Sequence, residues 1–100
     1  MMLLTKANRQ ALAPLGSGSE LATVKFFGSG RWTWYASEFD GDDTFFGYVE
    51  SGLGSDCDEF GYFSLSELTA MRFRPFGLPV ERDRYWSPRT FQEIRMKGAR

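Results

Sequence analysis

The chain of 100 residues contains no histidine, and this absence removes the side chain on which many catalytic and metal sites depend. Histidine is the one side chain whose ordinary pKa lies near neutrality, the commonest metal ligand, and the usual base beside a serine or cysteine nucleophile. Carboxylates, lysines and tyrosines remain as candidate catalytic groups. We therefore predict a protein that is not an enzyme and that binds no cofactor or metal.

Cysteine occurs once, at Cys57, so the chain cannot form an internal disulfide. Asp56, Asp58 and Glu59 lie beside this thiol in the sequence, and like charges disfavour a thiolate, so we expect no nucleophilic role for it. No window approaches the roughly 18 apolar residues that a membrane span requires. The apolar run at the N-terminus is shorter than the core of a signal peptide. We expect a cytoplasmic protein.

Lysine and arginine are absent from residues 32–71, a stretch that contains nine carboxylates. Residues 1–31 carry a net charge of +3 and residues 72–100 a net charge of +5, so the total of −1 conceals a strongly polar chain. Such segregation bears on the choice of partner rather than on the fold. We predict an anionic surface that binds a basic surface of another protein. Its residues are Glu38, Asp40, Asp42, Asp43, Glu50, Asp56, Asp58 and Glu59.

Two interpretations of these carboxylates stay open. In the first, they compete with nucleic acid for a basic groove, because carboxylates on one face of a strand recur about every 6–7 Å, similar to the spacing of phosphates. In the second, Asp residues favour turns and the C-terminal cations fold back to neutralise them. An EF-hand is excluded, since Gly41 is the fourth residue from Glu38 and the motif needs glycine at the sixth. A hard-cation site of another geometry and a paired-carboxylate hydrolase are weaker alternatives.

The C-terminal third interleaves arginines with aromatic residues, a pattern typical of nucleic-acid-binding segments. The sequence pI of about 5.4 argues against nucleic acid as the main partner, and pairing with the acidic half explains the same arginines. The alternative function is therefore a nucleic-acid-binding or regulatory module. Its residues are Arg72, Arg74, Arg82, Arg84 and Arg89.

The apolar pattern predicts one α+β domain over residues 1–100, with a three- to four-stranded antiparallel β-meander and short helices before and after it. The expected strands cover residues 22–27, 31–39, 44–50 and 59–63, with a hairpin turn at 40–43. The expected helices cover residues 5–13, 64–72 and 89–97. Ser64 and Glu67 have the spacing of a capping box that opens the second helix.

Aromatic residues occupy both faces of the predicted meander. By the alternation of a strand, Trp32 and Trp34 point to one side, and Tyr35 and Phe39 point to the other. A sheet with two apolar faces needs cover on both. Helices this short cover one face well and the other only in part. The remainder is either wrapped by residues 74–85 or left as a partner surface, and an exposed face suits a homodimer as well as a monomer.

Several short motifs occur in order along most of the chain, to about Asp83. They are Leu3–Leu12, Val24–Phe27, Trp32–Ala36, Glu38–Gly41, Asp43–Gly47, Gly61–Leu68, Phe76–Pro79 and Glu81–Asp83. Together they resemble a bacterial family known as domain of unknown function 2958. The resemblance implies no activity and no functional residues, but it implies a context of plasmids and integrative elements, often near anti-restriction genes. On this basis we expect an anti-CRISPR or anti-restriction inhibitor whose partner is a host nuclease or CRISPR effector complex.

Overall fold

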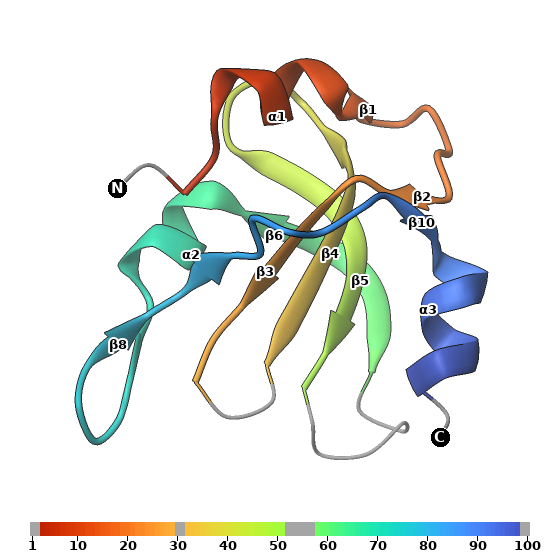
Figure 1. The fold of residues 1–100 in the computed structure, drawn as a ribbon. Coiled ribbons are helices and arrows are strands. Elements are labelled where there is room, and N and C mark those ends of the chain that lie inside the picture. The colour runs from red at the N-terminus through yellow and green to blue at the C-terminus, as the bar shows by residue number, and fades with distance from the viewer. Residues whose placement is uncertain (1–2, 30–31, 52–57, 99–100) are drawn as a thin grey trace.

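The computed structural model describes residues 3–29, 32–51 and 58–98, and a six-stranded sheet forms its centre (Figure 1). The strands follow the order β6, β5, β4, β3, β9, and β1 pairs with β4 off this path. Only β1 runs parallel to its neighbour among these described strands. The strands are β1 (Ala13–Pro14), β3 (Val24–Phe27), β4 (Thr33–Phe39), β5 (Thr44–Glu50), β6 (Glu59–Ser64) and β9 (Glu81–Arg82).

Helices and two small antiparallel pairs surround this sheet. The helices are α1 (Lys6–Ala11), α2 (Leu65–Ala70) and α3 (Phe91–Gly98). The pairs are β2 (Leu21–Ala22) with β10 (Arg89–Thr90), and β7 (Arg72–Phe73) with β8 (Leu78–Pro79). The predicted α+β class, with an antiparallel meander between short helices, is confirmed. The sheet is larger than predicted because β1 and β9, of two residues each, extend it.

An irregularity in β4 changes the side on which its last residues lie. The pairing with β5 shifts between Ala36 and Glu38, and the Ser37 hydroxyl donates to the carbonyl of Phe46 at 3.2 Å. An extra residue in a strand reverses the alternation of those that follow. Phe39 therefore packs in the same core as Trp34, and the prediction that it lies on the side of Tyr35 is wrong.

The sheet separates two clusters of buried residues. The larger cluster lies on the side of α1 and α2 and includes Phe26, Phe45 and Leu68. The smaller cluster lies on the side of α3. Its members are Ala22, Tyr35, Tyr48, Phe91 and Ile94. Cover on both faces is what a sheet with two apolar faces requires.

The cover on the α3 side is incomplete. Trp86, directly after the segment 74–85, lies 5.5 Å from the Tyr35 ring and donates its indole N–H to the carbonyl of Ala22 at 3.0 Å. Farther along this side, Phe60 and Tyr62 of β6 are 42% and 71% exposed. Exposure, one of the two predicted alternatives, describes Phe60 and Tyr62, whereas the cover of Tyr35 comes from Trp86, outside the segment 74–85 that was predicted to wrap this face.

Capping boxes fix the starts of α1 and α2. Thr5 and Ser64 are the N-caps, and each exchanges hydrogen bonds with the residue three positions on, as predicted for Ser64 with Glu67. Both helices end earlier than predicted, because the residues that follow them join strands. The pair Ala13–Pro14 joins β4, and the pair Arg72–Phe73 joins β8.

The last helix begins two residues later than predicted. Arg89 and Thr90 pair with β2 and are extended, so α3 starts at Phe91. The Thr90 hydroxyl accepts a hydrogen bond from the Glu93 N–H at 3.2 Å, and the Thr90 N–H donates to the Glu93 carboxylate at 3.0 Å. This exchange has the pattern of a capping box. Thr90 therefore opens the helix.

Candidate partner-binding groove

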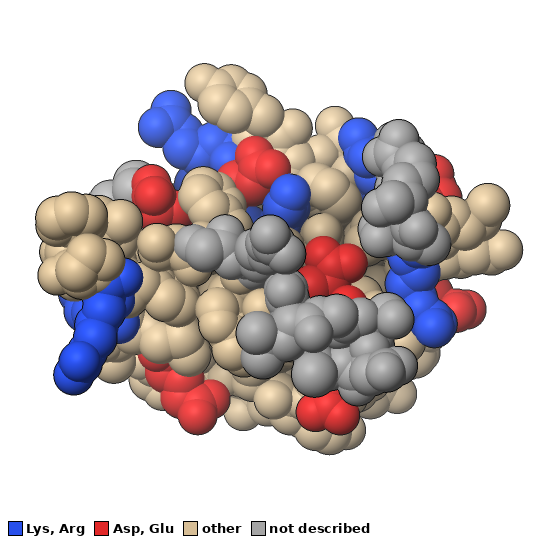
Figure 2. Space-filling model, turned by 90° about the horizontal axis from the view of Figure 1, so that it is seen from below, with Lys and Arg blue, Asp and Glu red and all other residues tan. Residues whose placement is uncertain are grey.

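The structure places the predicted acidic residues at opposite ends of β5 rather than on one surface. The length of β5 separates the two groups by about 20 Å, six steps of about 3.4 Å. Figure 2, which views the end away from the turn 40–43, shows acidic groups as separate spots among uncharged and basic residues. The group at the turn comprises Glu38, Asp40, Asp42 and Asp43; the group at the far end comprises Glu50, Asp58 and Glu59. Asp56 lies outside the described residues.

Glu38 is buried, with 4% of its surface exposed. Its two carboxylate oxygens accept hydrogen bonds from the N–H groups of Gly16 and Gly18, at 2.7 and 3.0 Å. These bonds hold the loop that follows β1 against the end of β4. Glu38 therefore serves the fold, and the prediction that it contacts a partner is not supported by its position.

The carboxylates of the hairpin turn also have local roles. One oxygen of Asp40 accepts hydrogen bonds from the N–H groups of Asp42, Asp43 and Thr44, at 2.8, 2.9 and 3.1 Å, and these bonds lower the pKa of Asp40. Asp43 accepts from the N–H and the hydroxyl of Ser66, both at 2.8 Å, which ties the turn to the first turn of α2. The interpretation that Asp residues serve local hydrogen bonding holds for this turn.

The second group of carboxylates lines a groove between the β5–β6 hairpin and α3. The groove has a volume of about 660 Å³. Glu50, Asp58 and Glu59 share it with Glu20, which comes from the segment before β2. Its aromatic side chains belong to Tyr48, Phe60 and Phe91. We call this site the acidic groove.

Arg95 is the basic residue among the described residues that line the acidic groove, and its position shows how the groove accommodates a cation. The Arg95 guanidinium of α3 lies over the rings of Tyr48 and Phe60, 5.9 and 5.8 Å from their centroids. Aromatic faces attract cations, and the attraction grows when the pair is shielded from water. Rings and carboxylates together therefore form a surface suited to a lysine or arginine side chain.

Burial and negative neighbours shift the titration of groups at the groove. The Tyr35 hydroxyl donates to the Glu50 carboxylate at 3.1 Å. Partial burial raises the pKa of Glu50, and the charge of Asp58 adds to the rise, while the Tyr35 bond and Lys25 oppose it. Burial, followed by the charges of Asp58 and Glu50, also raises the pKa of Tyr48. Each of these charges favours the entry of a cation.

The predicted arginines do not form one strip. The residues Arg72, Arg82 and Arg84 gather around two hollows beside β9. Arg89 lies over the Trp86 ring at 5.2 Å, and Arg74 lies in the turn between β7 and β8. Among the described residues, no ion pair joins a predicted acidic residue to Arg72, Arg74, Arg84 or Arg89, while Lys25 and Asp83 pair at 3.7 Å. The interpretation that the C-terminal cations fold back toward the acidic residues describes Arg95, which lines the acidic groove beside Glu50, Asp58 and Glu59.

Within residues 3–29, 32–51 and 58–98, no three histidine, cysteine, aspartate or glutamate side chains are arranged to hold a metal ion. The helices in these ranges lack the length and apolar character that crossing a membrane demands.

Sequence reasoning missed the part of the groove that comes from distant segments. Glu20, Phe91 and Arg95 reach the site because β2 pairs with β10 and the Phe91 N–H donates to the carbonyl of Glu20 at 2.9 Å. A pair of two-residue strands leaves no periodic pattern in the sequence. The spacing of Thr90 and Glu93 was the available signal for where α3 begins.

Comparison with known proteins gives a family without a described activity. A family model described as "Protein of unknown function (DUF2958)" matches residues 2–99. This match confirms the family that the motifs indicated. No curated protein and no solved structure matches the chain.

Proposed function

The chain belongs to the DUF2958 family, and from that premise we propose that it is a non-enzymatic inhibitor with which a mobile genetic element counters host defence. In this proposal, the acidic groove binds a basic surface with which a restriction nuclease or CRISPR effector complex normally holds nucleic acid. The observation that carries the proposal is the groove itself, where the described residues bring four carboxylates, three aromatic rings and a single basic residue to one hollow.

Surfaces that hold nucleic acid present lysine and arginine, because much of their affinity comes from neutralising phosphates. A side chain of this type that enters the acidic groove gains carboxylate partners and an aromatic face together. The hairpin carboxylates offer less, since Glu38 is buried and Asp40 and Asp43 are engaged within the chain. The support for an anionic binding surface therefore comes from a hollow and not from a row of charges along one strand.

Reversing one exposed charge of the groove tests the proposal. Glu59 lies on β6 with its side chain exposed, so we expect Glu59→Lys to fold and to repel a basic partner. A like-charge contact across an interface costs several kcal/mol, so binding should weaken by about tenfold or more. The measurement is transformation of a targeted plasmid into strains that each carry one active CRISPR or restriction system. The wild-type chain should raise the number of transformants in at least one strain, and Glu59→Lys should not.

Asp42→Lys is the matched control, because it makes the same change of charge at an exposed position outside the groove. This variant should protect the plasmid as well as the wild-type chain does. Equal loss of protection in both variants would show that net charge, and not the groove, matters. Protection in none of the strains would contradict the inhibitor function.

A further inference from the structure

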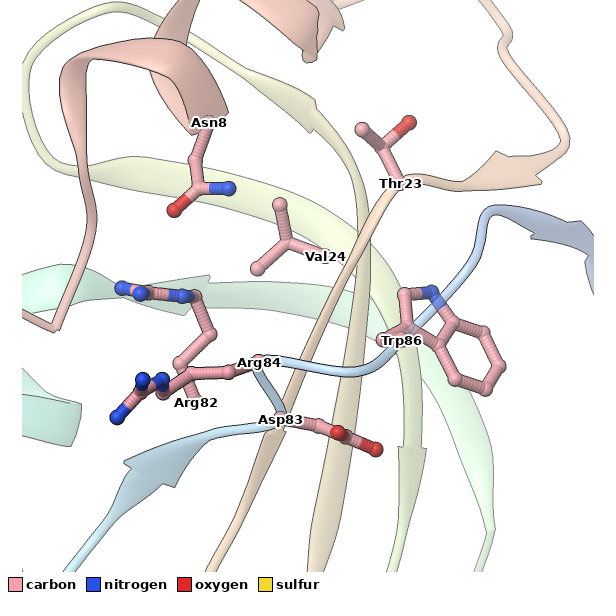
Figure 3. A pocket seen from close by; sticks show the side chains of 7 residues that line it. All are labelled: Asn8, Thr23, Val24, Arg82, Asp83, Arg84 and Trp86. Carbon is pink, nitrogen blue, oxygen red and sulfur yellow. The ribbon is translucent and has the colours of Figure 1, made fainter.

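The backbone after β8 places positive and negative side chains on opposite sides. Figure 3 shows Arg82 and Arg84 on the side that faces α1, while Asp83 points the other way. Asp83 is held there, because its carboxylate pairs with Lys25 at 3.7 Å and its N–H donates to the Lys25 carbonyl at 2.9 Å. The alternation of an extended backbone explains this separation. Two guanidinium groups thus share one side while the carboxylate between them is occupied elsewhere.

Both arginines line two hollows that adjoin each other. The first hollow, of about 280 Å³, has Asn8 of α1, Thr23 and Asp83 among its other lining residues, and the Asp83 carboxylate is the one that pairs with Lys25. The second, of about 300 Å³, has Arg72, Thr69 and one acidic residue, Glu81. Since Arg82 and Arg84 line both, they form the partition between the two hollows. The site lies on the side of α1 and α2, whereas the acidic groove lies beside α3.

Hydrogen bonds within the chain orient the polar groups of this site. An Nη1 atom of Arg82 donates to the Leu3 carbonyl at 2.9 Å, which fixes the plane of its guanidinium. The Asn8 Oδ1 atom accepts from the N–H and the hydroxyl of Thr5, at 3.0 and 2.8 Å. Because the oxygen of the amide is used in the cap of α1, its Nδ2 atom is the donor that Asn8 can offer to a ligand.

We propose that the first hollow binds a phosphate group of a nucleotide or of single-stranded nucleic acid. Guanidinium groups match the geometry of phosphate oxygens, and Arg82 and Arg84 supply two of them beside the Asn8 amide. The second hollow gives room for the next phosphate along a strand, with Arg72 at its wall. This site is separate from the acidic groove and does not depend on the inhibitor function.

The test uses the full chain and three probes, which are inorganic phosphate, ATP and a fluorescently labelled strand of ten thymidines at low salt. Phosphate and ATP should shift the side-chain NMR signals of Asn8 and Arg84, and the labelled strand should show a rise in anisotropy. Arg84→Gln should weaken binding of the strand by about tenfold, as expected for the loss of a charged hydrogen-bond partner. It should also reduce the slope of log affinity against log salt by about 0.7.

Two further variants separate this site from a general attraction between charges. Arg74→Gln removes the same charge from an exposed position that lines neither hollow, and it should change affinity by less than about twofold. Asn8→Asp keeps the oxygen that caps α1 and replaces the donor with a negative charge. It should fold normally and lose binding of all three probes.

Each result decides for or against the site. NMR shifts with phosphate and ATP, together with a strand that binds no more tightly than ATP, would support a nucleotide ligand. A strand that binds more tightly than ATP would support nucleic acid. No shift with any probe would overturn the proposal. Equal effects of Arg84→Gln and Arg74→Gln would also overturn it, because binding would then follow net charge alone.

Discussion

Glu38 shows that the surroundings of a single carboxylate decide its role. It belongs to the acidic stretch that predicts a binding surface, yet it is buried and accepts two backbone hydrogen bonds from Gly16 and Gly18. Each bond joins an oxygen of the buried carboxylate to a backbone N–H group of the loop that follows β1. Such bonds contribute about 1.5–3 kcal/mol, more than bonds between neutral groups.

Replacing this carboxylate should therefore destabilise the protein. Glu38→Gln keeps one acceptor but turns an NH2 group toward the second N–H group, so the free energy of unfolding should fall by about 2 kcal/mol. The measurement is urea unfolding followed by tryptophan fluorescence. Asp42→Asn, at an exposed position, should change the free energy by less than about 0.5 kcal/mol. Similar values for the two variants would show that the loop is not held by Glu38.

The sequence predicted the positions of residues that depend on their immediate neighbours. It did not predict those that depend on distant segments of the chain. The turn at 40–43 was predicted from its composition, and Gly41 has the positive φ of 88° that such a turn favours. The burial of Glu38 could not be predicted, because it requires both the irregularity at Ser37 and the distant loop that contains Gly16. Neither leaves a signal in the residues around position 38.

At the scale of elements, two glycines opposite each other show how closely β4, β5 and β6 approach. Gly47 of β5 pairs with Gly61 of β6. A Cβ atom on Gly47 would collide with the carbonyl group of Tyr35 and with the backbone of Ala36, whereas one on Gly61 would meet no atom within 4 Å. Gly47 is therefore required by the approach of β4 to β5, and Gly61 is not.

The two alanine variants should differ sharply. Gly47→Ala must push β4 and β5 apart and should cost about 3 kcal/mol of unfolding free energy, the upper range for overpacking. Gly61→Ala should be neutral or stabilising by up to about 1 kcal/mol, because glycine weakens the interior of a strand. Thermal unfolding by circular dichroism compares them. A stable Gly47→Ala variant would mean that the strands are farther apart than the structure shows.

Elements with a clear periodic pattern were predicted well, and those made by long-range pairing were not. The bounds of β5 agree with the prediction, and β6 differs by one residue at its end. The strands β1, β9 and β10 contain two residues each and exist because another segment offers backbone partners. Such pairing depends on the tertiary structure, which also shortened α1 and α2 and delayed the start of α3.

At the scale of the whole molecule, negative and positive side chains gather at two separate sites, and these sites do not follow the acidic and basic segments of the sequence. The acidic groove lies beside α3, and Arg82 and Arg84 lie near α1 and α2. Charge counts along the chain predicted that opposite charges mattered for partners. They could not predict that, of the seven predicted acidic residues that the structure describes, three would share a hollow, or that Glu20 would join them.

This separation predicts that the two sites act independently. Glu59→Lys should leave binding of the ten-thymidine strand within about twofold of the wild-type value, and Arg84→Gln should leave plasmid protection unchanged, because distant sites without shared contacts usually add. Anisotropy and transformation measure the two effects, and the double variant should lose both. Loss of protection in Arg84→Gln alone would mean that inhibition needs the bound nucleic acid.

The position of Arg95 has a consequence for selectivity. Its guanidinium lies over Tyr48 and Phe60 inside the acidic groove, so an incoming lysine or arginine competes with Arg95 for these two rings. Replacing one cation by another changes the binding free energy little, so a polyamine or a single lysine side chain should bind weakly. Only a surface that brings several cations at once gains net binding free energy. Arg95 of α3 therefore makes the groove selective for densely basic surfaces.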